Sequence, residues 1–383
     1  MIGMRKFPVV FFAAAFWIFS FAPVFSASLP PSTQGMLKKH KLDPSILHDI
    51  DKELAVPPDL LEKAKKEGRV RVQGTPGEAR DEKIFFAPFR ERYPFISLEY
   101  SGTSQQDRAV KTLTAYRSGR ILGEVVESLS GAVLTYVEAG ALEDMRTLPN
   151  WDKILPTAKD TNGLWANLQQ NYWCMSYNTK LVKKEDLPKS WEDLLKNPKW
   201  KGGNLALANR PSQWALQLWR VKGEKWTKDF LTQVFTEIRP QLRKEGTNTL
   251  PQLVAAGEFH AVIPSMAPHV SRIASEGAPV GYHCPELVPA TLGGSGILKG
   301  APYMNAGRVL MNWLMSKEGQ ISRYATYDST PSHKDLQRKE FLPFPEEVLG
   351  KQVVTPEPAF QEKTLPDLNE FWNKLWLGGA GAR

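Results

Sequence analysis

The sequence predicts an α/β protein built from two units, and two patterns along the chain support this. From residue 69 onward, a strand-like segment is followed three times by a short polar loop and a helix-like segment. That order is typical of a parallel sheet covered by helices. A long apolar segment then precedes a second run of the same kind, so we expect two α/β units joined by crossing strands. A chain of 383 residues is long enough for each unit to bury its own core.

The first unit shows the pattern most clearly. Residues 69–73 alternate apolar and polar side chains, as a half-buried strand does. The helix before them ends at Gly68, and the helix after them is expected to bury Ile84, Phe85 and Phe89 on one face. The elements predicted here are helices over 58–67, 78–93 and 105–117 and after residue 131, and strands over 69–73, 96–100 and 122–127.

An apolar and aromatic segment over 164–177 separates the two units. Because such a long strand precedes a new α/β unit, we expect it to cross from one unit to the other, and we expect residues 292–298 to return. The elements predicted beyond the crossing are strands over 204–208, 261–264 and 279–284, helices over 213–220, 225–235, 247–259 and 305–316, and an amphipathic helix around Phe371, Trp372, Leu375 and Trp376.

Residues 190–214 are the stretch around which we interpret the second unit. Ser190 suits the cap of a short helix, which ends at Asn197 because the next residue is a proline. Two glycines then lead into an apolar strand, and the loop 209–212 opens another helix. Free backbone N–H groups at a helix start favour an anion, so we expect this loop to form one wall of a ligand site.

Composition and charge argue against nucleic-acid binding. The formal net charge is +8, with 49 lysines and arginines against 41 acidic residues. These positive charges are spread along the chain without a long basic run, which disfavours a nucleic-acid surface. The excess is compatible with an anionic ligand.

The first 28 residues have the layout of a secretory signal peptide. Arg5 and Lys6 precede an apolar stretch over 7–25, and small residues from Ser26 to Ser28 offer a cleavage site. A polar segment follows, so we favour a cleaved signal over a membrane anchor and expect an exported, periplasmic protein.

Cys174 and Cys284 are the two cysteines of the chain. In an oxidising compartment an even pair can form a disulfide. Both lie in apolar, strand-like segments, so two buried thiols are the alternative, and the sequence leaves both open.

Several short motifs, in their order and spacing over about residues 60–335, resemble one family. It comprises the extracellular solute-binding proteins of ABC transporters, in the branch that includes ferric-iron, thiamine and polyamine binders. Each motif is weak alone, and the combination is specific. The similar pieces are Ala64-Lys-Lys-Glu-Gly68, Phe89-Arg-Glu-Arg-Tyr-Pro94, Ser190-Trp-Glu-Asp-Leu-Leu with Trp200-Lys-Gly202, Ala256-Gly-Glu258, Gly293-Gly294 with Ile297-Leu-Lys-Gly-Ala-Pro302, and Ser316-Lys-Glu-Gly-Gln320.

The resemblance implies a two-lobe periplasmic-binding-protein fold of type II. Each lobe is then a mostly parallel sheet flanked by helices, and crossover strands join the lobes. We expect a monomer without a cofactor that closes over a small solute and delivers it to an ABC permease. The divisions expected are a signal peptide over 1–28, a polar lead-in outside the core over 29–57, lobe 1 over 58–170 and 292–349, lobe 2 over 171–291, and a C-terminal segment over 350–383 that packs on a lobe.

The chain departs from the iron-binding members of this family at one position. Those members typically carry adjacent tyrosines after the strand that follows Ala-Gly-Glu, and this chain has Ser265-Met-Ala-Pro-His269 there. Ferric iron prefers phenolate and carboxylate oxygens, so a bare-iron site loses its main support. His269 alone does not make a metal site, and we predict none.

The loops after the first-lobe strands supply one set of candidate ligand residues. Their hydroxyl and N–H groups suit carboxylate, phosphate or phosphonate groups. Ordinary helix capping is the alternative use of the same residues. The candidates are Thr75, Gly77 and Arg80, then Ser101, Thr103 and Ser104, then Ser128 and Ser130.

The second lobe supplies the other set. Arg210 can form a two-pronged contact with an anion, and a solvated surface arginine is the alternative. The polar candidates are Asn209, Arg210, Ser212, Ser265 and His269. Trp173, Trp214, Tyr282 and Tyr324 are candidates for stacking on a ligand, with burial in the core as the alternative.

No catalytic motif was found in the sequence. The Gly-x-Ser-x-Gly, Gly-x-x-x-x-Gly-Lys and His-Glu-x-x-His patterns are all missing, so we predict a binding protein. The first alternative is a protein of the same fold that binds ferric iron or an iron chelate. The second is an exported enzyme or the ligand-presenting subunit of a sensor.

Overall fold

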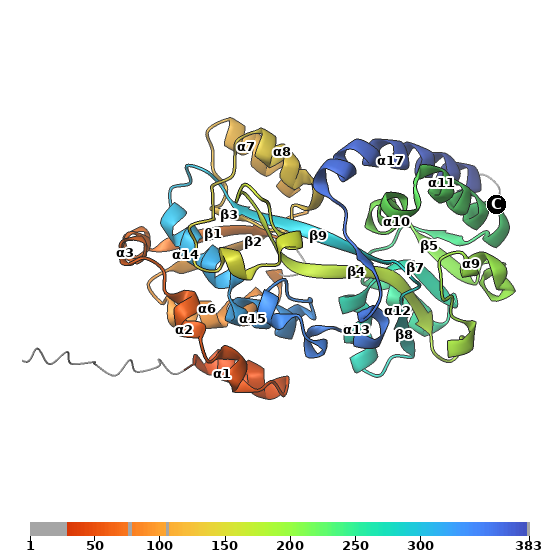
Figure 1. Ribbon diagram of the computed structural model, residues 1–383, viewed down its shortest axis with the longest axis horizontal. Helices are drawn as coiled ribbons and strands as arrows, with labels where there is room; N and C mark the ends of the chain where they lie inside the picture. The colour runs from red at the N-terminus through yellow and green to blue at the C-terminus, as the bar shows by residue number, and fades with distance from the viewer. Residues whose placement is uncertain (1–28, 76–78, 105–106, 381–383) are drawn as a thin grey trace, which may run out of the picture.

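The computed structural model describes residues 29–75, 79–104 and 107–380 (Figure 1). The predicted signal peptide and the candidate ligand residue Gly77 lie outside these ranges. The described strands form one mixed sheet in the order β2-β1-β3-β9-β4-β7-β5-β6, with β8 paired to β4 and β10 paired to β9. Helices flank this sheet, and the expected α/β fold is confirmed.

Two long antiparallel strands run through both lobes. They are β4 (Ala166–Asn178) and β9 (Val288–Ile297), and their register pairs Ala166 with Ser295 and Tyr172 with Ala290. At one end β9 pairs with β3, and at the other β4 pairs with β7 and β8 (Figure 1). The prediction of crossover strands is confirmed, and the expected lobe boundaries fall inside these two strands.

Lobe 1 carries the parallel strands β1 (Arg69–Gly74), β2 (Ser97–Gly102) and β3 (Val125–Val126). The third strand is shorter than predicted, although Glu124 and Glu127 continue the hydrogen bonds to β1 on either side of it. The main helices of this lobe are α3 (Pro58–Glu67), α5 (Glu82–Phe85), α6 (Ala87–Arg92), α7 (Leu113–Arg117), α8 (Val133–Glu138), α14 (Met304–Met315) and α15 (Lys317–Tyr327).

The single helix predicted over 78–93 is instead two short ones, α5 and α6. Phe85 and Phe89 are buried as expected, but Ile84 is 62% exposed, so that part of the prediction was wrong. Pro88 explains the break, because it lacks the N–H that would continue α5 and fits the first turn of a new helix.

Residues 29–57 belong to the core of lobe 1, so the prediction of a lead-in outside the core was wrong. Helices α1 (Pro31–Lys39) and α2 (Ile50–Leu54) flank a turn at Pro44–Leu47, and Leu37 and Leu47 are among their buried side chains. The carbonyl of Glu53 accepts hydrogen bonds from the side chains of Asn150 and Asn312. The apolar residues lie in three short elements, so no helical period spans the segment.

Lobe 2 carries the parallel strands β5 (Leu205–Ala208), β6 (Gln241–Arg243) and β7 (Ala261–Met266), with β8 (Val280–His283) on β4. Trp191, Trp200 and Trp214 are fully buried on one side of this sheet. The helices are α9 (Asp193–Lys196), α10 (Ala215–Lys222), α11 (Glu224–Gln233), α12 (Thr249–Ala256) and α13 (Ala267–Ser275).

Helix α16 (Pro345–Val348) leads into the C-terminal segment, which comprises β10 (Val353–Val354) and α17 (Pro358–Ala380). Strand β10 pairs in parallel with the start of β9, and α17 lies along α10 and α11 (Figure 1). Trp372 and Trp376 of α17 are buried in the lobe 2 core. Within the part of the chain that the structure describes, no helix is both long and apolar enough to cross a membrane.

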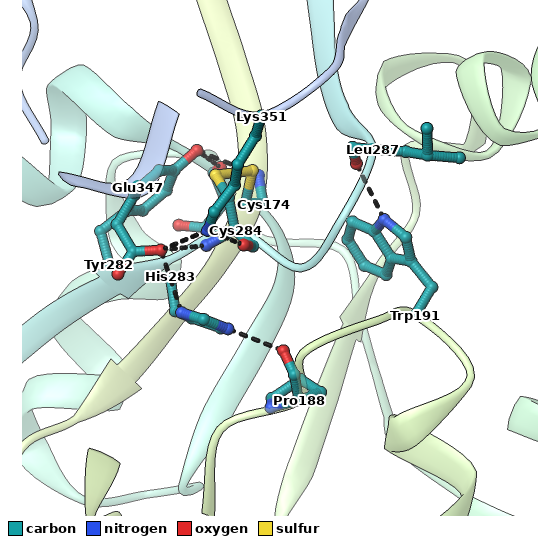
Figure 2. The surroundings of a disulfide bond; sticks show 10 residues. Cys174, Pro188, Trp191, Tyr282, His283, Cys284, Leu287, Glu347 and Lys351 are labelled. Carbon is teal, nitrogen blue, oxygen red and sulfur yellow. Dashed lines mark hydrogen bonds and ion pairs between the residues drawn. A yellow bond between two sulfur atoms is a disulfide. The ribbon is translucent and has the colours of Figure 1, made fainter. Parts of the chain in front are cut away.

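Cys174 and Cys284 form a disulfide, which decides between the two alternatives that the sequence left open (Figure 2). The bond joins β4 to the residue that follows β8, across a sequence separation of 110. Both cysteines are fully buried.

A group of polar contacts attaches α16 and the start of the C-terminal segment beside the disulfide (Figure 2). One oxygen of Glu347 accepts from the backbone N–H of Cys284 at 2.9 Å and lies 3.0 Å from Nδ1 of His283. Lys351 donates to the same carboxylate at 3.2 Å and to the carbonyl of Cys284 at 2.5 Å. Burial tends to raise the pKa of Glu347, but these donors outweigh it and lower the pKa to about 2.

Replacing both Cys174 and Cys284 with alanine is expected to lower the free energy of unfolding by about 2–5 kcal/mol, because the open chain gains entropy when unfolded. Urea denaturation of the wild type and the double variant checks this. Adding a reductant should lower the stability of the wild type to that of the variant. Equal denaturation midpoints for oxidised wild type and variant would contradict the prediction.

Glu347→Gln is expected to lower the free energy of unfolding at pH 7 by about 1.5–3 kcal/mol, since it removes charge-assisted hydrogen bonds. The folded pKa lies below the ordinary value of 4.5, so the carboxylate stabilises the fold above about pH 4.5 and loses this effect as pH falls toward 2. Denaturation curves between pH 7 and pH 3 should therefore converge. A difference that stays constant with pH would argue against the charged contact.

Candidate functional site

A single arginine joins the loops that follow the three parallel strands of lobe 1. The side chain of Arg108 is buried and donates to the carbonyl of Gly74 at 2.9 Å and to that of Ser128 at 3.3 Å. The same guanidinium also donates to the carbonyl of Thr103. Gly74 is the last residue of β1, and Ser128 and Thr103 lie in the loops after β3 and β2. Arg108 thus gathers the carboxyl ends of the strands, where ligands bind in open α/β sheets.

The loop after β3 is held against the crossing strand β9 in an uncommon backbone conformation. Ser128 and Ser130 have φ angles of 54° and 51°, in the left-handed region that costs a non-glycine residue about 1–3 kcal/mol. The N–H of Ser128 donates to Oγ of Ser295 at 3.2 Å, which helps to hold this conformation. A Cβ atom on Gly293 would lie 3.3 Å from Cα of Ser128, so a side chain there would push the loop away by a few tenths of an ångström.

A cavity of about 390 Å³ lies between the lobes and includes predicted residues from both. Ser130 lines it from lobe 1, Ser212 lines it from lobe 2, and Thr291 lines it from the crossing strand β9. The neighbouring side chains are Leu134, Thr135 and Glu138 of α8, and Gln213 of lobe 2. The remaining wall comes from the C-terminal segment. Of the predicted ligand residues, Ser130 and Ser212 line this cavity, and the other described ones do not.

Trp173 supports the cavity without lining it. Its indole Nε1 donates to Oγ1 of Thr291 at 2.8 Å, and its ring is 5% exposed. The tryptophan therefore fixes the orientation of the Thr291 hydroxyl. Stacking of its ring on a ligand stays a prediction.

Arg210 brings a positive charge to the loop after β5. Its side chain is partly buried, and within the described residues its guanidinium makes no hydrogen bond or ion pair. Burial lowers the pKa of Arg210, as expected for a cation without a counter-ion. An anionic group would remove this cost.

His269, at the start of α13, is electrostatically coupled to Arg210. Burial is the main cause that lowers the pKa of His269 to about 4, and the charges of Arg272 and Arg210 lower it further. The imidazole is therefore neutral at physiological pH, and its Nδ1 is buried with no hydrogen-bond partner among the described residues. A neutral His269 leaves Arg210 as the charged member of this pair.

The other predicted residues take different positions. Tyr282 is buried against Phe344, and its hydroxyl donates to the carbonyl of Ser265 at 3.2 Å and accepts from the N–H of Cys174 at 3.0 Å. Oδ1 of Asn209 accepts from the indole of Trp372 at 2.7 Å. Arg80 is exposed and forms an ion pair with Asp81. The side chains of Ser101 and Ser104 are also exposed, and the carbonyl of Thr75 accepts a hydrogen bond from the Tyr100 hydroxyl. Trp214 lies in the lobe 2 core, and Tyr324 packs on Phe341.

A family model described as "Bacterial extracellular solute-binding protein" matches residues 85–347. The chain belongs to this family. Membership confirms the predicted resemblance, and it confirms that the protein binds a solute outside the cytoplasm rather than acting as an enzyme.

Solved structures of similar proteins show the same fold. Iron-bound HitA from Pseudomonas aeruginosa is 17% identical, with 80% of this chain and 99% of that chain covered and a TM-score of 0.67. AfuA from Actinobacillus pleuropneumoniae, with exogenous fructose-6-phosphate bound, is 19% identical, with 82% and 98% covered and a TM-score of 0.63. Both are periplasmic binding proteins in fold, which confirms the predicted type II architecture.

A similar sequence is the Fe(3+)-binding periplasmic protein of Serratia marcescens. It is 26% identical over 182 residues, which are 44% of this chain and 51% of that protein. The chain thus matches about half the length of this relative.

Across 29–75, 79–104 and 107–380, one group of three side chains is close enough to hold a metal ion. It comprises Glu53, His333 and Asp335 of lobe 1, and none of them lines the cavity between the lobes. Nζ of Lys317 lies 3.3 Å from a carboxylate oxygen of Glu53, and this positive charge disfavours a cation there. We therefore treat this group as a structural contact.

Arg108→Met is expected to lower the free energy of unfolding by about 2–4 kcal/mol, because it keeps apolar volume but removes the hydrogen bonds to the carbonyls of Gly74, Thr103 and Ser128. Arg80→Met is the matched control, since Arg80 is 77% exposed and should change stability by less than about 0.5 kcal/mol. Urea denaturation compares the two. Equal effects of the two substitutions would show that Arg108 does not hold the loops together.

Proposed function

We propose that the protein is the monomeric periplasmic binding component of an ABC import system and that it carries a small, hydroxylated anion to the permease. The observation that carries this proposal is the cavity of about 390 Å³ lined by Ser130, Ser212 and Thr291. Its walls come from both lobes and from the strand that joins them, so hinge closure would enclose a ligand there.

The unpaired charge of Arg210 favours an anion. The loop that carries it leads directly into Ser212 and Gln213, which line the cavity. A partly buried guanidinium without a counter-ion gains a charge-assisted contact when a phosphate or carboxylate binds. Hydroxyl groups of the same ligand would face the serine and threonine side chains.

The relative AfuA supports a phosphorylated sugar as the solute class, since its structure holds fructose-6-phosphate. A hexose phosphate combines one anionic end with several hydroxyl groups. That combination fits a cavity lined by hydroxyl, amide and carboxylate groups, with Arg210 in the loop that leads into it.

An iron chelate is the second candidate, because HitA and the Serratia protein are described as iron-bound or iron-binding. The described cavity lining contains no tyrosine, histidine or cysteine, and its carboxylates are Glu138 and Glu362. Iron would thus need a chelator such as citrate to supply most of its oxygen ligands.

Fructose 6-phosphate is expected to raise the melting temperature of the mature protein, and Arg210→Gln should weaken its binding by about 10–100-fold, as for a lost charged hydrogen bond. Arg80→Gln is the control and should leave binding unchanged. Thermal shift and calorimetry with fructose 6-phosphate, inorganic phosphate and ferric citrate check this. A shift with ferric citrate alone, together with a visible charge-transfer band, would favour the iron chelate.

A further inference from the structure

The C-terminal segment forms a third wall of the cavity between the lobes. The segment lies beyond residue 347, where the match to the family ends. Six of its residues line the cavity, namely Pro356, Gln361, Glu362, Leu365, Pro366 and Asn369. The cavity is therefore bounded by lobe 1, by lobe 2 and by a segment outside the family match.

This wall is firmly attached to lobe 2. Leu368, Trp372 and Trp376 of α17 are buried in the lobe 2 core, and Nε1 of Trp372 donates to Asn209 in the loop that also carries Arg210. Upstream, β10 pairs with β9, and Arg220 donates to the carbonyl of Thr355. The first turns of α17 are thus held beside the cavity by contacts on both sides.

The same segment touches lobe 1. A Cβ atom at Gly131 would lie 2.0 Å from Nε2 of Gln361, so the amide of Gln361 rests directly on this glycine. Gly131 follows Ser130 in the loop after β3. Figure 1 shows α17, drawn in blue, starting near α8 of lobe 1 and running over lobe 2. Gln361 therefore lies where the two lobes approach one another.

The side chains of this wall carry amide and carboxylate groups, whereas Arg210 carries a positive charge. Gln361, Leu365 and Asn369 are spaced four residues apart and share one face of α17. Glu362 adds a carboxylate, and the described lining of the cavity contains no lysine, arginine or histidine. Amide groups donate and accept hydrogen bonds with hydroxyls, and a carboxylate accepts them and repels a second anion.

We infer that Gln361 and Asn369 contact the hydroxyl-rich part of the solute and so determine specificity, while the anionic end faces Arg210. This inference rests on the proposed function and adds a wall that the family match does not include. The solute class it requires is a polyhydroxylated anion. An anion without hydroxyl groups gains nothing from α17.

Calorimetry with fructose 6-phosphate and with inorganic phosphate tests the inference on the full mature chain. Gln361→Ala and Asn369→Ala are each expected to weaken the binding of fructose 6-phosphate about tenfold and to leave that of phosphate unchanged. Asn373→Ala is the matched control, because Asn373 is exposed one turn further along α17 and does not line the cavity. It should leave both affinities unchanged.

The possible outcomes separate the inference from the proposed function. If the wild type binds fructose 6-phosphate and neither cavity variant weakens it, the inference is overturned and the proposed function stands. Binding of inorganic phosphate but not of fructose 6-phosphate also overturns the inference and keeps an anionic solute. If the wild type binds neither compound, both are overturned.

Discussion

The pairing of β4 with β9 is the constraint on which the rest of the structure depends. These strands carry the chain into lobe 2 and back, and their ladder runs from Ala166 and Ser295 in one lobe to Tyr172 and Ala290 at the crossing. Several residues around the cavity are held in place by contacts with these two strands. Ser128 bonds to β9 through Ser295, β10 pairs with β9, and Trp173 of β4 orients Thr291. A shift in register would therefore move all of these contacts together.

Two arginines near the carboxyl ends of the strands differ in their partners. Arg108 is buried with carbonyl acceptors around it, so its charge is used inside lobe 1 to hold three loops. Arg210 lies in lobe 2 without a partner among the described residues, so its charge is available to a ligand. The difference is one of surroundings, because the two side chains are chemically the same.

Much of the fold could be predicted from local pattern, and much of the site could not. Alternation over 69–73 and the apolar run over 164–177 indicated strands, because the burial pattern of a strand can be recognised from consecutive residues. Arg108 was not singled out, since its acceptors come from three loops that meet only after folding. The sequence left the disulfide open for the same reason, and it missed the burial of residues 29–57, whose buried side chains lie in separate short elements. Contacts between distant segments leave no period in the sequence.

The C-terminal segment adds a cavity wall that lies outside the family match. The family match ends at residue 347, and the shared fold supplies the walls from lobe 1 and lobe 2. Gln361 and Asn369 lie on α17, which reaches the cavity because Trp372 and Trp376 fix it on lobe 2. Two proteins with the same pair of lobes can therefore present different groups to a solute. In the proposed site, the solute is selected by the hydrogen bonds that this third wall offers as well as by the charge of Arg210.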